Sequence, residues 1–257
     1  MNVKELGNKL TEAGRLKLRP LCVYGADKIP EGAVPSYKVD RCIAKAVYTS
    51  AFFENTPPLY IESANDKCCT GGIAWLGLAE PHPKLKYFVT IGTPDFHGGA
   101  AEHLKATPDL FEESRKHAGK ITPFGKFIVI GPCTIDIAPE MIRSIILFAG
   151  SEQIRNLCGL AQFNSSDLFF KTVIPGGPIC ATMFAFPAGM AENAPKGSAY
   201  VGPVDPTGNP WLPSDLMIMG IPAALAKQMA IDMRESFICK RSRIAYPEKH
   251  AIIKSNL

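Results

Sequence analysis

Signatures of several common function classes are missing from this sequence of 257 residues. Neither G-x-G-x-x-G nor G-x4-G-K-[ST] is present, so a dinucleotide site and a P-loop nucleotide site have no sequence support. The sequence also lacks the G-x-S-x-G elbow of a Ser/His/Asp hydrolase and the C-x2-C pairs that build structural zinc sites. The sequence therefore gives no positive evidence for these four functions.

Charge and hydrophobic runs exclude two further partners. Twenty-eight Lys and Arg residues against 24 Asp and Glu give a net charge of +4, without the clustered basic runs that nucleic-acid binding favours. No window offers the eighteen or so uninterrupted apolar residues of a membrane helix, and the first residues contain no apolar secretory segment. We expect a cytoplasmic protein that binds neither nucleic acid nor membrane, and its cysteines to be reduced.

The order of apolar segments predicts an α/β fold. Residues 127–131, 142–149 and 216–220 are apolar runs typical of buried strands, and the second leads through Gly150 and Ser151 into a helical pattern at 152–163. This rhythm predicts one domain over residues 1–257, with a central sheet flanked by helices and a mixed α+β arrangement as the alternative. Apolar residues make up 46% of the chain, which leaves room for a homo-oligomer interface.

The remaining patterns predict further elements. Helices are expected at 3–16, 40–53, 98–118 with an interruption at Pro108, and 222–238. Short apolar helices are expected at 182–186 and at 73–78, the latter after a polar turn at 65–72 that contains Asn65 and Asp66. Short strands are expected at 18–25, 59–61, 87–92 and 199–201. The basic stretch at 240–243 is interpreted as a solvated terminus.

The eight cysteines are the most informative feature. Two of them, Cys69 and Cys180, lie beside glycines at the start of short apolar helical segments, where Gly71, Gly72, Gly176 and Gly177 would let backbone N–H groups approach a cluster or a phosphate. A helix N-terminus also stabilises a thiolate. By contrast, Cys22, Cys158 and Cys239 lie in apolar patterns and are predicted to belong to the core.

Two more cysteines have open roles. Cys133 follows the strand at 127–131 and could face a site or the core. Cys68 precedes Cys69 directly, and neighbouring residues on a helix do not face the same way. The pair is therefore not expected to direct both sulfurs at one centre.

Several segments together resemble the DUF169 family of anaerobic archaea and bacteria. The resemblance covers about residues 15–235. Three of its segments surround cysteines: DRCIAKA at 40–46, DKCCTGG at 66–72 and PICA at 178–181. Two more lie near the predicted central strands: GSEQIRNL at 150–157 and SDLMIMGIP at 214–222. The resemblance implies an architecture more than an activity, because the family is largely uncharacterised.

The resemblance also marks particular residues. The family's recurring cysteines fall on Cys42, Cys69 and Cys180. This chain has Thr70 where the family usually has proline, and it lacks the arginine that the family tends to carry within 199–210. Any role of that arginine in holding a substrate carboxylate does not carry over.

Three hypotheses follow. In the first hypothesis, Cys42, Cys69 and Cys180 hold one [4Fe–4S] cluster, with Cys68 or Cys133 as a fourth ligand. An enzyme of this kind would be a lyase or an oxidoreductase that acts on a small molecule. In the second, Cys69 or Cys180 is a nucleophilic or redox-sensing thiol without metal. The third is a non-catalytic protein that binds a ligand or carries a cluster. Packing of the same cysteines in the core is the structural alternative to all three.

Overall fold

One mixed sheet organises the computed structural model, which describes residues 1–62, 67–203, 205 and 209–240. Its strands lie in the order β2-β3-β4-β1-β5-β8-β7-β6. The inner pairs are antiparallel, whereas β2 with β3 and β6 with β7 are parallel. The strands are β1 (Leu21–Ala26), β2 (Val34–Pro35), β3 (Leu59–Glu62), β4 (Phe127–Pro132), β5 (Ile142–Gly150), β6 (Thr172–Val173), β7 (Ala199–Gly202) and β8 (Leu216–Pro222). The predicted α/β class and central strands are confirmed, with β1 placed between β4 and β5.

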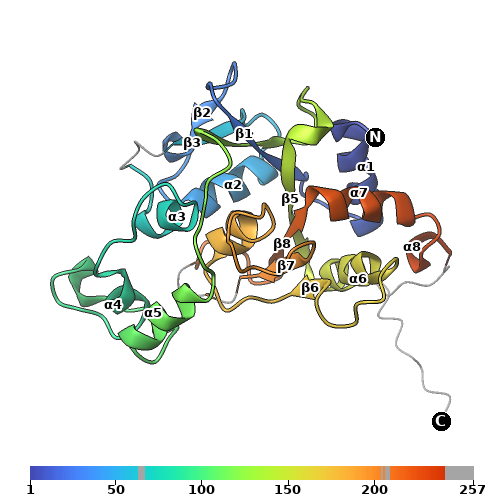
Figure 1. Ribbon diagram of the computed structural model, residues 1–257. Helices are drawn as coiled ribbons and strands as arrows, with labels where there is room; N and C mark the ends of the chain where they lie inside the picture. Colours follow the sequence, from blue (N-terminus) through green and yellow to red (C-terminus); the bar gives the residue numbers. More distant parts are fainter. Residues whose placement is uncertain (63–66, 204, 206–208, 241–257) are drawn as a thin grey trace, which may run out of the picture.

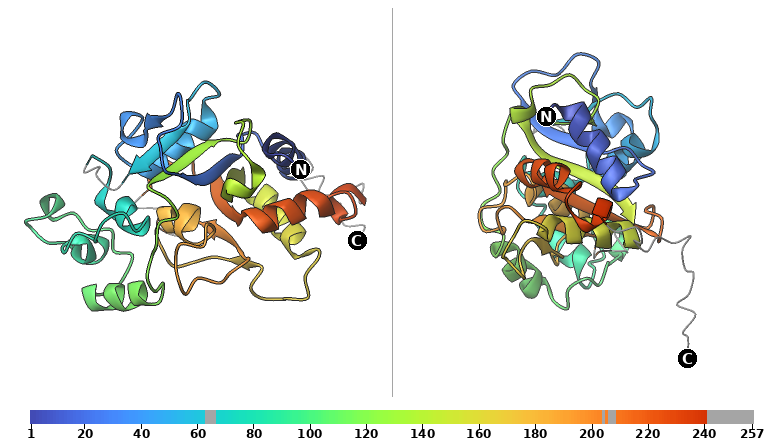
Figure 2. Two further views of the ribbon diagram at one scale, coloured as in Figure 1. Left: turned by 45° about the horizontal axis from the view of Figure 1, so that its top comes forward. Right: turned by 90° about the vertical axis from the view of Figure 1, so that its right-hand side faces the viewer.

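Both faces of the sheet are covered. Helices α1 (Val3–Gly14), α6 (Ser151–Gln162) and α7 (Ala223–Asp232) pack on one face. The other face carries α2 (Ile43–Phe52), α3 (Thr70–Trp75) and the π-helical turn η4 (Ala181–Ala185). Figure 1 shows α1 and α7 beside the N-terminus at the right, α6 below them, and α2 and α3 further left towards β3, and both views of Figure 2 show the red helix α7 next to the blue α1. The protein therefore has two apolar cores, separated by the sheet.

Strand β5 shows why the two cores form. Its side chains are buried almost without interruption, and they alternate between faces: Ile145 and Leu147 enter the core under α1, while Ile146 and Phe148 enter the core under α2. A strand buried on both faces is a continuous apolar run rather than an alternating one. The same alternation puts Cys22 of β1 on the α1 side and its neighbours Leu21 and Val23 on the α2 side.

Caps define the ends of α1 and α6. The Asn2 side chain accepts a hydrogen bond from the N–H of Glu5 at 2.8 Å, which satisfies a free donor at the start of α1. Arg15 ends that helix in the left-handed conformation, with φ 47°. Gln153 accepts from the Gly150 N–H at 2.8 Å and donates to the Gly14 carbonyl at 3.0 Å. This side chain therefore links the end of α1 to the start of α6.

Three predicted elements differ from the structure. Residues predicted as a strand at 87–92 form helix α4 (Leu85–Val89), because this segment packs with α5 (Pro108–Lys116) away from the sheet and has no strand to pair with. Of the helix predicted at 98–118 with an interruption at Pro108, the part that begins at Pro108 forms α5 with Thr107 as its cap, whereas the part before it does not form a regular α-helix, since Gly98 and Gly99 adopt positive φ. The predicted last helix divides into α7 and α8 (Phe237–Lys240) around Ser236, whose hydroxyl donates to the Met233 carbonyl.

The core prediction for the cysteines is partly wrong. Cys22 is fully buried and Cys158 is half-buried, but Cys239 is exposed on α8. A short terminal helix packs one face only, and Ile238 takes the place against the core. The predicted turn at Asn65 and Asp66 and the basic stretch beyond Lys240 lie outside the described residues.

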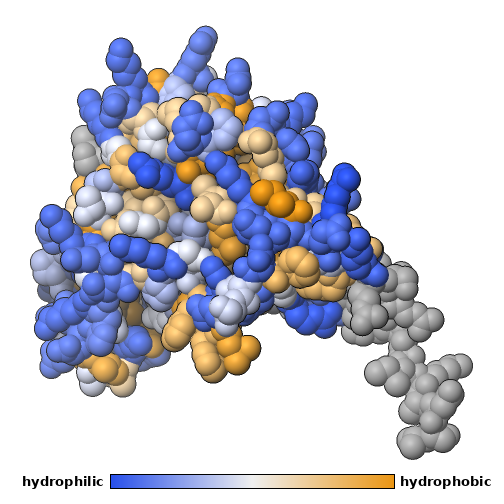
Figure 3. All heavy atoms as spheres, turned by 45° about the vertical axis from the view of Figure 1, so that its right-hand side comes forward, coloured by the Kyte–Doolittle hydropathy of each residue, from blue (hydrophilic) through white to orange (hydrophobic). Residues whose placement is uncertain are grey.

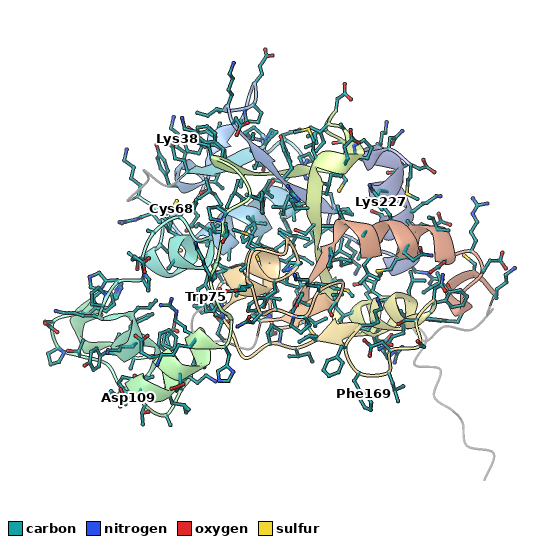
Figure 4. The ribbon with its side chains drawn as sticks, in the orientation of Figure 1. Lys38, Cys68, Trp75, Asp109, Phe169 and Lys227 are labelled. Carbon is teal, nitrogen blue, oxygen red and sulfur yellow. The ribbon has the colours of Figure 1, made fainter. Side chains whose placement is uncertain are left out.

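The connection between α6 and β6 leaves apolar side chains outside both cores. Leu168, Phe169 and Phe170 are each at least 60% exposed. Phe169 points away from the ribbon in Figure 4, and hydrophobic side chains project from the lower edge of the surface in Figure 3. Among the described helices, none is long and apolar enough to cross a membrane.

Close packing of η4 on the sheet requires glycine in β8. A Cβ on Gly220 would collide with the carbonyl oxygen of Thr182 and lie 2.7 Å from Pro187 Cγ. The backbone that carries Cys180 can therefore lie directly on the sheet.

Gly220→Ala is expected to lower the free energy of unfolding by about 1–3 kcal/mol, the usual cost of overpacking a core. Gly176→Ala is the matched control, because the nearest atom to its new Cβ would be Lys105 Nζ at 3.8 Å. Urea titrations of both variants test the difference, and equal midpoints would contradict the proposed contact.

Candidate sulfur site

Three cysteines from distant parts of the chain meet at the start of α2. Cys42 is the residue before α2, Cys69 the residue before α3 and Cys180 the residue before η4. The Cys42 thiol donates a hydrogen bond to Cys69 Sγ, and the charge of Cys69 acts on Cys180. The structure thus brings together the three residues predicted as the main ligands.

Backbone N–H groups of α2 face these sulfurs. The N–H of Ile43 donates to Cys69 Sγ, that of Ala44 to Cys180 Sγ and that of Lys45 to Cys42 Sγ. They belong to the first turn, whose N–H groups have no partner within the helix. Successive free N–H groups at a helix start favour negative charge, so this arrangement stabilises thiolates.

The segment before α2 is held in place by Asp40. Its carboxylate accepts a hydrogen bond from the Cys42 N–H at 2.8 Å and pairs with Lys45 at 2.8 Å. The Cys69 N–H in turn donates to the Arg41 carbonyl at 2.9 Å. These contacts join the two cysteine-bearing segments through their backbones.

The site favours one thiolate over its neighbours. The hydrogen bond from Cys42, followed by the N–H groups of Ile43 and Gly72, lowers the pKa of Cys69 to about 6. The same hydrogen bond raises the pKa of Cys42, and burial raises the pKa of Cys180. Without a metal, the site therefore holds a Cys69 thiolate beside two thiols.

The absence of a side chain at Gly72 lets two of the sulfurs pack closely against this residue. A Cβ at this position would lie 2.8 Å from Cys69 Sγ, 3.0 Å from Ile43 Cδ1 and 3.4 Å from Cys180 Sγ. Cys69 Sγ and Cys180 Sγ therefore both lie close to Gly72 and close to each other. The other predicted glycines, Gly71, Gly176 and Gly177, show no sulfur among the nearest atoms to their Cβ positions.

The two proposed fourth ligands have other partners. Cys68 is buried with its Sγ 3.5 Å from Ser36 Oγ, and its charge acts on Cys180, as the charge of Cys69 acts on Cys68. Figure 4 shows Cys68 at the start of α3 and Trp75 at its end. Cys133 lies on the opposite face of the sheet, where its thiol hydrogen-bonds with Cys22 under α1. The structure therefore separates Cys133 from the other three sulfurs, whereas Cys68 lies at the edge of the site with its thiol directed to Ser36.

The carboxyl group of Asp205 lies beside the site, and no sequence pattern pointed to it. Asp205 is 6% exposed and accepts a hydrogen bond from the Ile179 N–H at 3.4 Å, next to Cys180. Its charge acts on both Cys180 and Glu102. For residues 199–210 the sequence offered only the absence of an arginine, and that absence does not predict the position of Asp205.

The donor set is soft and anionic. Thiolates suit iron–sulfur clusters, copper(I) and zinc, and cluster sites also use backbone N–H groups around the sulfurs. Within the described part of the chain, no group of three or more His, Cys, Asp or Glu side chains, the three cysteines included, is placed to hold a single metal ion.

A family model matches residues 9–231 of the chain. The model is DUF169, described as an uncharacterised ArCR family. Searches of curated proteins and of solved structures found no match.

Two adjacent glycines allow a matched test of the close packing of the sulfurs against Gly72. We expect Gly72→Ala to lower the unfolding temperature of the metal-free protein, because its Cβ would press on Cys69 Sγ and Ile43 Cδ1. Gly71→Ala, whose nearest atom would be Leu85 Cδ1 at 3.8 Å, should be neutral or stabilise α3 by up to about 1 kcal/mol. Calorimetry measures both, and a Gly72→Ala variant as stable as Gly71→Ala would contradict this close packing.

The lowered pKa of Cys69 predicts the pH dependence of its alkylation. In metal-free protein, the rate with iodoacetamide should rise through a midpoint near pH 6, since the thiolate forms above that pKa. Cys42→Ala removes the hydrogen-bond donor, so the midpoint should move up towards the ordinary value of about 8.5. Mass spectrometry of the Cys69 peptide follows the rate. A wild-type midpoint already at the ordinary value would contradict the Cys42–Cys69 hydrogen bond.

Proposed function

We propose that this chain, which belongs to the DUF169 family, binds an iron–sulfur cluster through Cys42, Cys69 and Cys180. The observation that carries the proposal is the meeting of the three sulfurs at the N–H groups of Ile43, Ala44 and Lys45. Cluster thiolates are anionic, and hydrogen bonds to them tune such sites. The free N–H groups in the first turn of α2 face the three sulfurs, an arrangement that packing of the cysteines in the core would not require.

The residues fit a cluster better than a single ion. Each iron of a [4Fe–4S] cluster takes one protein thiolate, so three cysteines hold three irons. Gly72 carries no side chain at the point where a Cβ would lie 2.8 Å from Cys69 Sγ and 3.4 Å from Cys180 Sγ, so no side chain at this position stands between the two sulfurs. Binding would replace the Cys42–Cys69 hydrogen bond, because thiolates on different irons do not share a proton.

Three ligands rather than four would make the site reactive. Since Cys68 pairs with Ser36 and Cys133 lies across the sheet, neither is included as a ligand in this proposal. A cluster held by three thiolates leaves one iron open, which supplies Lewis-acid or electron-transfer chemistry to a small molecule. We therefore favour an enzyme of anaerobic metabolism over a passive carrier.

Thiol chemistry without metal is the second candidate. It is favoured by one observation, the pKa of about 6 at Cys69, which gives a nucleophilic thiolate near neutral pH. Retention of activity in iron-free protein, with loss on alkylation of Cys69, would favour this candidate.

The cluster is tested by anaerobic purification, reconstitution and measurement of iron, sulfide and electron paramagnetic resonance. The wild type should bind about four irons per chain, as a [4Fe–4S] cluster requires. Cys69→Ser and Cys180→Ser should each lose most of that iron.

Cys133→Ser is the matched control, since it removes a buried free thiol from the opposite face of the sheet. Its iron content should equal that of the wild type. A colourless wild type after reconstitution, or equal losses in all three variants, would contradict the proposal.

A further inference from the structure

A surface loop between α6 and β6 presents three neighbouring apolar side chains to the solvent. Residues 163–171 form this loop, and the exposed fractions are 75% for Leu168, 74% for Phe169 and 60% for Phe170. Figure 1 shows the loop below α6, and Phe169 points away from the body of the protein in Figure 4. Adjacent exposed apolar side chains of this size mark an interaction surface.

The loop is held in one conformation by its own hydrogen bonds. The Asp167 carboxylate accepts from the N–H groups of Phe169 and Phe170, both at 3.0 Å. The Ala199 N–H donates to the Lys171 carbonyl at 2.9 Å, which ties the end of the loop to β7. A loop that is ordered before it binds loses less conformational entropy on association.

A pocket of about 220 Å³ lies beside the loop, between α6 and α7. Its apolar lining includes Leu160, Leu225 and Met229, which belong to the core under α1. Lys171 also lines the pocket, so the loop ends at the edge of the pocket. An apolar cavity of roughly 150 Å³ holds benzene, so this pocket has room for a phenyl ring.

Two further exposed apolar side chains lie next to the pocket lining. Phe163 precedes the pocket residue Asn164 at the end of α6, and Ile231 follows the pocket residue Gln228 by three positions on α7. Residues three apart on a helix lie on the same face. The side chains of Phe163 and Ile231 are 45% and 60% exposed. The loop, the pocket and these two residues therefore form one apolar surface.

Opposite charges lie on the same surface. Lys171 and Asp232 both line the pocket, and within the described residues neither of them forms an ion pair. Asp232 accepts a hydrogen bond from Gln228 at 2.8 Å. A two-fold axis would bring Lys171 of one copy to Asp232 of a second copy and would repeat this pair with the copies exchanged. The surface is therefore complementary in charge to itself.

A second copy of the chain is the occupant that these features fit. A symmetric dimer uses the same surface on both subunits, so this surface must contain both a projection and a matching hollow. Here the apolar loop lies directly beside the apolar pocket. A membrane surface instead attracts clusters of basic residues, whereas the acidic Asp167 lies in this loop with Lys171.

We propose that residues 163–171, α6 and α7 form the interface of a symmetric homodimer, in which Phe169 of each copy enters the pocket of the other. The two Lys171–Asp232 pairs then fix the orientation of the copies. The pocket lies on the α1 face of the sheet, whereas Cys42, Cys69 and Cys180 lie on the α2 face. The dimer therefore does not rest on the proposed cluster.

Sedimentation equilibrium of the full chain tests the dimer, with a reductant present because Cys239 is exposed. The wild type should have twice the mass of the chain at micromolar concentration. Phe169→Ser should raise the dissociation constant at least about tenfold, since buried aromatic side chains dominate interface energies. Phe53→Ser is the matched control, because it replaces an exposed phenylalanine at the end of α2, and it should leave the dissociation constant unchanged.

An exchange of charge tests the pairing between copies. Lys171→Asp and Asp232→Lys should each be monomeric, because each variant would bring like charges together at both contacts. An equimolar mixture of the two variants should form a heterodimer, in which both contacts again join opposite charges. Circular dichroism shows whether each variant is folded, and Phe169→Ser, at an exposed position, tests the interface independently.

Three results would overturn the proposal: a wild type that stays monomeric throughout the micromolar range, a dimer that tolerates Phe169→Ser, or a mixture of the two folded charge variants that stays monomeric. A monomeric wild type that sediments with phosphatidylcholine–phosphatidylglycerol vesicles, and loses this binding in Phe169→Ser, would assign the surface to a membrane instead.

Discussion

The structure depends on the free N–H groups at the start of α2. Three successive donors, on Ile43, Ala44 and Lys45, each meet a different sulfur. These donors have no partner inside the helix, and thiolates are among the groups that satisfy them best. The hydrogen bond from the Cys69 N–H to the Arg41 carbonyl and the packing of η4 on β8 bring Cys69 and Cys180 to these N–H groups.

The sheet and its glycines meet that requirement. Gly220 lets η4 lie directly on β8, which carries Cys180 to the α2 face, and Gly72 lets the sulfurs of Cys69 and Cys180 pack closely against α3. The same sheet keeps a second sulfur pair apart, because Cys22 and Cys133 lie in the other core. Segregation by face therefore separates the Cys22–Cys133 pair from the three sulfurs at the start of α2.

Sequence patterns predicted the central sheet well, because β4, β5 and β8 are apolar runs that only a doubly buried strand explains. They predicted Cys69 and Cys180 from local signals, glycine beside cysteine at a helix start. Cys42 came from the family resemblance, as the first turn of α2 has no glycine to mark it.

The remaining features depend on long-range contacts. Tyr87 and Phe88 favour a strand locally, yet α4 forms because no strand lies beside it. Asp205 reaches the Ile179 N–H from an irregular segment that no periodicity in the sequence connects to Cys180. The partner of Cys133 could not be predicted either, since it depends on the register of β1 with β4.

The most direct test of a cluster on these three cysteines is a crystal structure of the anaerobically reconstituted protein, with anomalous diffraction measured at the iron absorption edge. The account predicts iron peaks bonded to the sulfurs of Cys42, Cys69 and Cys180, and none beside Cys68 or Cys133. Iron bonded to a different set of cysteines, or no iron peak between these three sulfurs in protein that contains iron, would contradict it.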